Sequence, residues 1–288
     1  MIKAILYTLI CVVSWAFIPV ASKEILKDMN NYAMLLFSNA ISTVVLFFYL
    51  LLSKKVCLLK KYSPKDYLVL SFLGFLGSYL FYIVLYKAFS LSLAQEVFII
   101  NYTWPILIVL LSAPILKERL NPTKLISITI SFFGVVIILT RGNPSHIKFT
   151  SVKGDLLALI ASFCFALFSV LGKKVKYDQI VSVFIYFLSA TVFSLLSIKY
   201  AHIKSITVNS LIWLFINGAF INGISYIFWF KALKSTKAAV VSNIVYLTPA
   251  LSLLFISAIL KERIETYSIF GLLFILTGIA IQLKPRLT

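Results

Sequence analysis

The 288-residue chain is 61% hydrophobic and only 12% charged, with a mean hydropathy of +1.02 and a formal net charge of +18. Soluble domains hold about 45–50% apolar and about 25% charged residues, so this composition excludes a water-soluble enzyme and a disordered chain. The apolar residues run continuously instead of alternating with polar ones, which disfavours a membrane β-barrel.

Continuous apolar runs follow one another along the chain, and a helix needs about 20 apolar residues to cross a bilayer. The sequence therefore predicts an all-α integral membrane protein with ten transmembrane helices and short loops. The first run, with Lys3 before it and Pro19-Val20-Ala21-Ser22 at its end, also has features of a signal peptide. We interpret it as a span because a matching segment recurs later in the chain. The predicted spans are residues 4–21, 32–52, 67–89, 94–116, 123–140, 154–172, 180–200, 209–230, 238–260 and 266–283.

Basic residues are distributed unequally over the two sides that ten spans define. If the N-terminus is cytoplasmic, 17 of the 27 Lys and Arg residues fall on the cytoplasmic side. Cytoplasmic loops carry the excess of basic residues, so the sequence predicts a multi-pass protein of the cytoplasmic membrane with both termini in the cytoplasm. The lysines are scattered at span ends, and we therefore attribute them to topology and contact with anionic lipid instead of nucleic-acid binding.

Cysteines and histidines are few and far apart. Cys11, Cys57 and Cys164 form no Cys-x-x-Cys pair, and His146 and His202 lie in predicted loops. We therefore expect no metal site, no cofactor and no disulfide framework. A membrane enzyme would need a cluster of His, Asp, Glu or Cys at a membrane face, so the sequence predicts that the chain is not an enzyme.

The second half of the chain repeats the first. At a shift of 144 residues, prolines, glycines and a charged turn coincide, and at a shift of 150 the first span matches the sixth. Matched Leu, Ile and Val residues are common in any apolar sequence, whereas matched Pro, Gly and Lys-Glu-Arg are not. The decisive matches are Pro105 with Pro249, Gly134 with Gly278, Gly74 with Gly218, and Ile115-Leu116-Lys117-Glu118-Arg119 with Ile259-Leu260-Lys261-Glu262-Arg263.

The repeat divides the chain into two units, residues 1–145 and 146–288, with five predicted spans each. Because five is odd, the second unit enters the membrane from the opposite side. Inverted repeats of this kind are a transporter architecture, with the substrate site between the halves near the midplane. A channel or a structural scaffold has no comparable need for this arrangement.

Two five-span units, each with a Pro-centred fourth span, a Leu-Lys-Glu-Arg turn and a Gly-containing last span, resemble the drug/metabolite transporter superfamily, EamA type. Within span 4, Ala94-Gln95-Glu96-Val97 followed by Asn101-Tyr102-Thr103-Trp104-Pro105 is similar to a segment of the aromatic amino acid exporter branch. The resemblance implies a secondary transporter that exports small metabolites, amino acids among them, by alternating access. Another solute class, such as a drug cation or a nucleotide-sugar-like solute, remains the alternative. The pattern makes no prediction of the oligomeric state.

Two prolines near the centres of spans 4 and 9 predict breaks in the helices. Proline has no amide hydrogen, so Pro105 frees the carbonyl of Asn101 and Pro249 frees that of Val245. An unpaired carbonyl within the membrane must face protein or a wet cavity, which predicts a central site beside the breaks. The alternative is a packing kink bridged by a Ser, a Thr or water.

Polar and aromatic side chains beside these breaks in spans 4 and 9, together with others on spans 1, 3 and 8, are the candidate substrate-binding residues. Side chains of this kind at membrane depth normally face the bundle interior. Hydrogen bonding between helices and the aromatic belt at the membrane surface are the alternative roles. The candidates are Trp15, Tyr82, Asn101, Tyr102, Trp104, Asn222, Asn243 and Tyr246.

Glu96 is the only acidic residue within an apolar run and away from a basic helix end. It is a candidate for coupling transport to protons or for contact with a substrate amine. The alternatives are compensation of a helix dipole and a salt bridge to Lys87. For the paired Lys-Glu-Arg turns, 117–119 and 261–263, we expect anchoring and ion pairs within each loop, with gating as the alternative.

Overall fold

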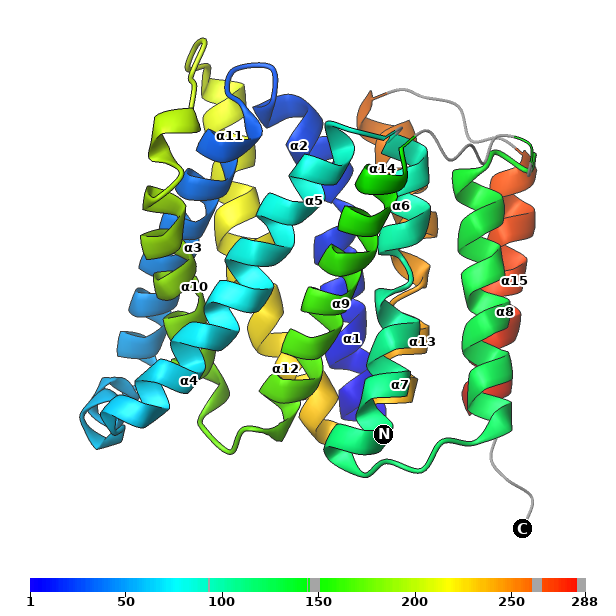
Figure 1. Cartoon of the computed structure of the whole chain (residues 1–288), viewed down its shortest axis with the longest axis horizontal. Coiled ribbons are helices and arrows are strands. Elements are labelled where there is room, and N and C mark those ends of the chain that lie inside the picture. The colour runs from blue at the N-terminus through cyan, green and yellow to red at the C-terminus, as the bar shows by residue number, and fades with distance from the viewer. Residues whose placement is uncertain (93, 144, 146–150, 261–265, 284–288) are drawn as a thin grey trace.

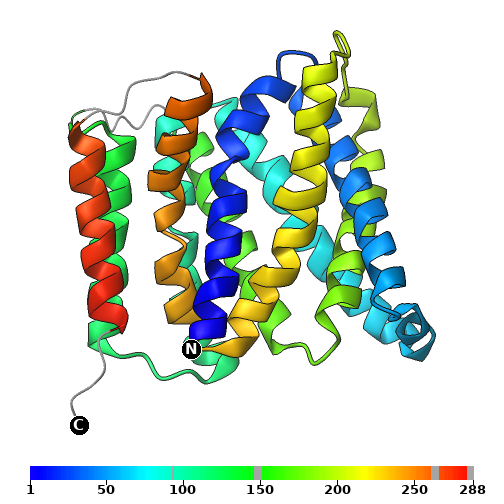
Figure 2. The same cartoon turned by 180° about the vertical axis from the view of Figure 1, so that it is seen from behind.

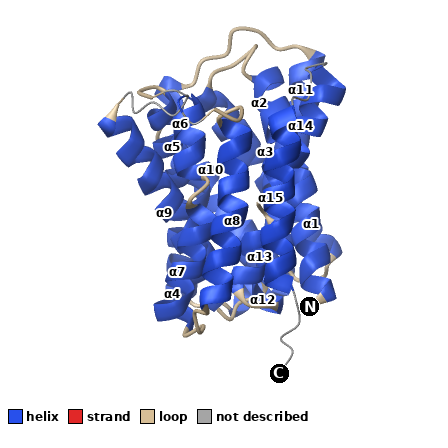
Figure 3. Cartoon of the chain, turned by 90° about the vertical axis from the view of Figure 1, so that its right-hand side faces the viewer, coloured by secondary structure: helices blue, strands red, loops and turns tan. Residues whose placement is uncertain are grey.

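The computed structural model describes residues 1–92, 94–143, 145, 151–260 and 266–283. These residues form helices joined by short loops (Figure 3), apart from one isolated backbone bridge between Met29 and Ile203. Nine helical stretches of the described chain are long and apolar enough to cross a membrane. The remaining predicted span, span 7 (180–200), is a shorter helix of 17 residues, α10 (Gln179–Leu195), which packs along its length against other spans.

Five spans consist of one continuous α-helix. Besides α10, these are α3 (Asn31–Leu52), α8 (Pro122–Leu139), α9 (Val152–Lys174) and α15 (Thr266–Leu283). Short 3₁₀ helices, η1 (Val56–Lys61) and η4 (Ile198–Tyr200), follow α3 and α10.

The other five spans are interrupted. Spans 1, 4 and 9 each consist of two helices with a non-helical joint, and spans 3 and 8 each contain a π-helical segment. Spans 1, 4 and 9 are α1 (Ile2–Ala16) with α2 (Ile18–Ile25), α6 (Ala94–Asn101) with α7 (Trp104–Leu116), and α13 (Ala238–Ile244) with α14 (Leu247–Leu260). Span 3 is α4 (Pro64–Gly74), η2 (Phe75–Leu80) and α5 (Phe81–Phe89), and span 8 is α11 (Val208–Ile216), η5 (Asn217–Ile224) and α12 (Ser225–Ser235).

The two halves of the chain run in opposite directions through the bundle. Helix α1 begins and α15 ends at the same end of the molecule, which we call the terminal end (Figures 1 and 2). Helix α1 runs away from the terminal end, whereas α9, the first helix of the second half, runs toward it (Figure 1). This arrangement agrees with the inverted repeat that the sequence predicts.

The last spans of the two halves, α8 and α15, form a closely packed pair at one edge of the bundle (Figures 1 and 2). Glycines allow their backbones to touch. A Cβ atom at Gly278 would lie 2.4 Å from the Ser127 carbonyl oxygen, and one at Gly134 would lie 2.5 Å from that of Gly271. Close contact through small residues is a common way to associate helices in a membrane.

Helices from both halves alternate in the centre of the bundle. From the second half, α9 packs against α5, α6 and α7 of the first. From the first half, α1 packs against α12 and α14 of the second. The interior between them contains large buried aromatic side chains, so the two halves share one core.

At the end opposite the termini, a buried carboxylate joins the loop after α2 to the loop before α11. The carboxylate of Asp28 accepts hydrogen bonds from the Ser205 hydroxyl at 2.6 Å and from the hydroxyl and amide of Thr207 at 2.5 and 3.1 Å. The Asp28 carbonyl oxygen accepts from the amides of Lys204 and Ser205. The side-chain bonds, that from Ser205 above all, hold the pKa of Asp28 well below its usual range.

Asp28→Asn is expected to lower the unfolding temperature near neutral pH, and this effect should become smaller in acid. Because the folded state lowers the pKa of Asp28, its stabilisation is fully present above the unfolded pKa of about 3.9 and disappears as the pH falls through the folded pKa. Unfolding temperatures of both proteins in detergent, measured from about pH 7 to about pH 3, check this. A difference between them that does not change with pH would contradict it.

Candidate functional site

Spans 4 and 9 are broken next to the prolines at their centres. In span 4, α6 ends at Asn101 and α7 begins at Trp104, directly before Pro105. In span 9, α13 ends at Ile244 and α14 begins at Leu247, two residues before Pro249. Pro249 leaves the Val245 carbonyl without its usual helical partner. This carbonyl accepts a hydrogen bond from the Thr248 amide at 2.9 Å instead, so it is paired within the break in span 9.

A cavity of about 130 Å³ lies beside the break in span 4, between helices of both halves. Five of the residues predicted from the sequence line it: Trp15, Tyr82, Asn101, Tyr102 and Trp104. Among the described residues of this lining, none is Asp, Glu, Lys, Arg or His. The other lining residues are Ile18, Pro19, Phe81, Leu85, Phe165, Tyr226, Thr248 and Ser252.

Equivalent positions of the two repeats line this cavity together. Tyr82 and Tyr226 are 144 residues apart, as are Trp104 and Thr248, and Trp15 and Phe165 are 150 apart. These are the shifts at which the two halves of the sequence match. The cavity therefore lies where an inverted-repeat transporter has its substrate site, between the halves.

Closely packed aromatic rings form the wall of the cavity toward the terminal end. The Trp104 ring centre lies 4.9 Å from that of Phe165, 5.6 Å from that of Trp229 and 6.3 Å from that of Trp15. Trp229 belongs to α12, which runs from Tyr226 toward the terminal end (Figure 1), so it lies beyond the cavity on that side. We call Trp15, Trp104, Phe165 and Trp229 the aromatic cluster.

Hydrogen bonds fix two of these rings. The Trp15 indole N–H donates to the Ser225 hydroxyl at 2.9 Å, and the Trp229 indole N–H donates to the Ser169 hydroxyl at 3.1 Å. The aromatic cluster is therefore a rigid wall, since its rings are held by packing and by polar contacts.

Two buried polar atoms of the cavity lining have no hydrogen-bond partner in the described part of the chain: Asn101 Oδ1 and Thr248 Oγ1. Most buried polar groups in proteins are paired, so such atoms require an explanation. The sequence pattern did not indicate Thr248. Its alignment with Trp104 at the shift of 144 residues was the available signal.

Three of the predicted residues lie outside this lining. Tyr246 and Asn243 are fully buried against the α8–α15 side of the bundle. The Tyr246 hydroxyl donates to the Tyr102 carbonyl at 3.1 Å, and the Asn243 amide donates to the Gly278 carbonyl at 3.0 Å. The third, Asn222, accepts from the Tyr82 hydroxyl at 3.4 Å.

Asn222 lines a smaller polar cavity of about 30 Å³, next to the central one and sharing Tyr82 and Ile18 with it. The π-helical winding of η5 explains why Asn217 lines it as well. With about 4.4 residues per turn, positions five apart share a face, which they do not in an α-helix. The equivalent span contains η2 at the matching position, and the sequence pattern indicated neither segment.

Two predicted groups fall outside the described residues. The side chain of Glu96 is one, although its backbone belongs to α6. The turn Lys261-Glu262-Arg263 is the other. Their proposed roles rest on the sequence alone.

The turn 117–119 forms its ion pair with the other half of the chain, and not within its own loop as expected. The Glu118 carboxylate accepts from Lys173 Nζ at 2.5 Å and from the Ala238 amide at 3.0 Å, and Lys173 also donates to the Thr236 carbonyl at 2.6 Å. Both charged side chains are only 14% exposed. The reason is geometric: α7, α9 and α13 all have ends at the terminal end, so Glu118 meets Lys173 there (Figure 1).

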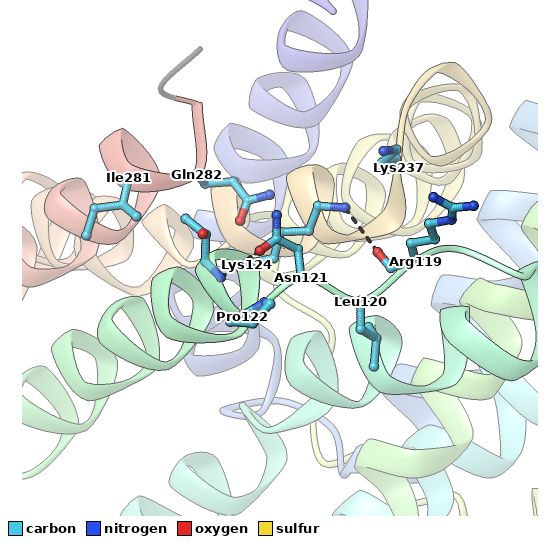
Figure 4. Close-up of a pocket in the computed structure, with 9 residues that line it drawn as sticks. Arg119, Leu120, Asn121, Pro122, Lys124, Lys237, Ile281 and Gln282 are labelled. Carbon is cyan, nitrogen blue, oxygen red and sulfur yellow. Dashed lines mark hydrogen bonds between the residues drawn. The ribbon is translucent and has the colours of Figure 1, made fainter. Parts of the chain in front are cut away.

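A second, larger cavity of about 660 Å³ lies at the terminal end, between the α7–α8 loop, the start of α13 and the end of α15 (Figure 4). Arg119, Lys124 and Lys237 line it, and Lys124 donates to the Arg119 carbonyl at 3.5 Å. It is separate from the central cavity. Its positive charge suits a position beside anionic lipid headgroups, in agreement with the basic residues at span ends.

The family profile of the EamA-like transporters matches this chain twice, over residues 2–140 and 152–283. The chain belongs to the EamA-like transporter family. It is therefore a multi-pass membrane transporter of the drug/metabolite type, with a small-molecule substrate and a lipid bilayer around it, and not an enzyme.

Relatives in this family come from bacteria and archaea. The uncharacterized transporter YoaV of Bacillus subtilis is 27% identical over 290 residues, covering 97% of this chain and 96% of YoaV. An uncharacterized transporter of Archaeoglobus fulgidus is 26% identical over 226 residues, covering 77% of this chain and 78% of the relative. A protein crystal structure matches with a TM-score of 0.87 and 20% identity, over 97% of this chain and 96% of the other, which shows that the fold is shared.

Proposed function

We propose that this EamA-like transporter is a secondary transporter that exports small metabolites without net charge, amino acids with apolar or aromatic side chains foremost, by alternating access. The observation that carries the proposal is the central cavity. Equivalent positions of both repeats line it, its walls are aromatic, and none of the lining residues that the structure describes is Asp, Glu, Lys, Arg or His. Sites for small molecules are mostly apolar with a few placed polar groups.

Electrostatics decides which solutes suit this cavity. A net charge at membrane depth is costly unless a partner of opposite charge is present. A zwitterion has no net charge, whereas a nucleotide-sugar-like solute would bring uncompensated phosphates. An organic cation is the second candidate, because the faces of Trp and Tyr rings attract cations.

The division into two repeats, 1–145 and 146–288, belongs to this proposal, and the two matches to the family profile support it. In an inverted-repeat transporter, the halves rock about the central site and open it to one side at a time. Here the aromatic cluster and the Glu118–Lys173 contact both lie on the terminal-end side of the cavity. We infer that the described conformation is closed toward the terminal end.

Counterflow in proteoliposomes tests the function. Vesicles are loaded with unlabelled solute, and uptake of labelled solute is followed without ATP, with apolar amino acids, acidic amino acids, organic cations and sugar nucleotides as the panel. We expect saturable exchange of net-neutral amino acids that compete with one another. Exchange of organic cations alone would support the second candidate, and no exchange of any solute would contradict a secondary transporter of these classes.

We propose a cytoplasmic location for the terminal end, on the basis of the 17 basic residues assigned to that side. In a cysteine-free background, single cysteines at Lys60 and Lys174 should be shielded from an impermeant thiol reagent in intact cells. A cysteine at Ser145 should react. Labelling of Lys60→Cys from outside would reverse the orientation.

Protons are the proposed coupling ion if Glu96 has a transport role. Glu96→Gln should then abolish accumulation driven by a pH gradient and leave counterflow intact, because exchange needs no net driving force. Unchanged accumulation would leave Glu96 with a purely structural role at the start of α6.

A further inference from the structure

Asn101 and Thr248 bring unpaired polar atoms into the central cavity from different halves of the chain. Asn101 is 7% exposed and Thr248 is 5% exposed. Asn101 Oδ1 and Thr248 Oγ1 are both buried without a hydrogen-bond partner in the described residues. Asn101 ends α6 at the break in span 4, and Thr248 precedes Pro249 in α14.

Two neighbouring hydroxyl groups of the lining already have hydrogen-bond partners, unlike these two atoms. The Ser252 hydroxyl donates to the Thr248 carbonyl at 2.9 Å, and the Tyr82 hydroxyl donates to Asn222. A buried polar atom without a partner destabilises the folded protein, and the penalty is removed when a ligand supplies the missing bond.

We propose that Asn101 and Thr248 together bind the hydrogen-bonding head group of the transported solute, and that this head group must carry an N–H or O–H donor. The amide oxygen of Asn101 can only accept, whereas the Thr248 hydroxyl can both accept and donate. An ammonium group satisfies both atoms, and an amino acid carboxylate can in addition accept from Thr248. A solute whose head group is a carboxylate alone leaves Asn101 Oδ1 unpaired. The proposal rests on the proposed function and specifies how its substrates are recognised.

Asn101 and Thr248 do not occupy equivalent positions in the two repeats. This asymmetry gives the bound solute a single orientation. Thr248 occupies the position that Trp104 occupies in the first repeat, and the equivalent of Asn101 is Val245. The smaller Thr248 leaves the space that a second indole would fill. The apolar body of the solute then lies against Trp104 and Phe165, with its head group toward Asn101 and Thr248.

The size of the cavity limits the size of the solute's apolar body. An engineered apolar cavity of about 150 Å³ holds benzene, so about 130 Å³ admits a body somewhat smaller than a phenyl ring in this conformation. A branched aliphatic group such as that of leucine is therefore the appropriate probe.

Three probes with the same branched body separate the head groups: leucine, 3-methylbutylamine and 4-methylpentanoate. Binding is measured as the rise in unfolding temperature of the purified protein in detergent, which does not depend on transport. We expect leucine, which has no net charge, to bind most tightly. The amine and the carboxylate each carry one net charge, and the amine should bind about tenfold more tightly than the carboxylate, since one hydrogen bond to a charged group is gained. Thr248→Val, which removes the hydroxyl at constant shape, should weaken leucine binding about tenfold, and the control Thr248→Ser should stay within about twofold.

Asn101→Leu should reduce the preference for the amine over the carboxylate to less than about twofold. An unchanged preference in Asn101→Leu together with unchanged leucine affinity in Thr248→Val would overturn the inference. So would tighter binding of 4-methylpentanoate, or no binding of any probe, by the unaltered protein. If the amine and leucine bind as expected but no solute undergoes counterflow, the proposed function fails and the binding site stands.

Discussion

Glu118→Lys is expected to open the central cavity toward the terminal end. The change places a cation opposite Lys173 and removes the acceptor for the Ala238 amide. A hydrogen bond to a charged group contributes about 1.5–3 kcal/mol, and about 1.4 kcal/mol changes a population tenfold. A reporter cysteine at Ser252, which lines the cavity, should therefore react at least about tenfold faster with a thiol reagent applied at the terminal end.

The doubly exchanged variant Glu118→Lys with Lys173→Glu distinguishes this contact from a simple salt bridge. The Ala238 amide donates to Glu118, and the Thr236 carbonyl accepts from Lys173. After the exchange, a donor faces a donor and an acceptor faces an acceptor, so we expect no rescue. Lys27→Met removes the ion pair of an exposed lysine with Glu24 at the opposite end of the bundle and serves as the control. Labelling of the reporter at the same rate in Glu118→Lys and in Lys27→Met would contradict a closing role.

Trp104→Ala is expected to change the order in which solutes are transported, in favour of larger apolar bodies. Its ring both lines the cavity and contacts three other rings of the aromatic cluster. Removing a buried Trp side chain costs about 3–5 kcal/mol of stability, so a lower unfolding temperature should accompany the altered order. Competition for counterflow and abundance in the membrane, measured on the same variant, separate the two effects.

Tyr246→Phe is the matched control for this prediction. Tyr246 is buried outside the cavity lining, and the change removes only the hydroxyl that donates to the Tyr102 carbonyl. The order of solutes should remain that of the unaltered protein. An unchanged order in Trp104→Ala, with reduced abundance, would show that Trp104 serves packing alone.

Hydropathy predicted the spans well because crossing a bilayer demands a long apolar helix whatever its neighbours are. The predicted span 180–200 extends beyond the observed helix α10. A turn at Leu196 and Ser197 ends this helix, although the apolar sequence continues after it. Pro105 and Pro249 located the breaks in spans 4 and 9, since a proline lacks the amide hydrogen that would bond to the carbonyl four residues earlier. The π-helical segments η2 and η5 were not predicted, because no single residue type produces them.

The sequence predicted only part of the candidate site. Residues of span 4 and of span 9 show why. Asn101 and Trp104 were chosen for their place beside Pro105, and both line the cavity. Asn243 and Tyr246 were chosen for their place on a stripe of span 9, but both are buried outside the lining. The repeat equivalent of Trp104 that lines the cavity is Thr248. Sequence periodicity gives the face of a helix, whereas the partner of that face depends on tertiary packing.

One measurement tests the central claim that solutes cross the membrane through this cavity. Cys11, Cys57 and Cys164 are replaced, a single cysteine is placed at Ser252, and an impermeant thiol reagent is applied to each membrane face in turn, with and without a transported solute. We predict faster reaction from the end opposite the termini, slower reaction from the terminal end, and protection by the solute from both. Rapid reaction from both faces with no protection by a solute that undergoes counterflow would contradict the account.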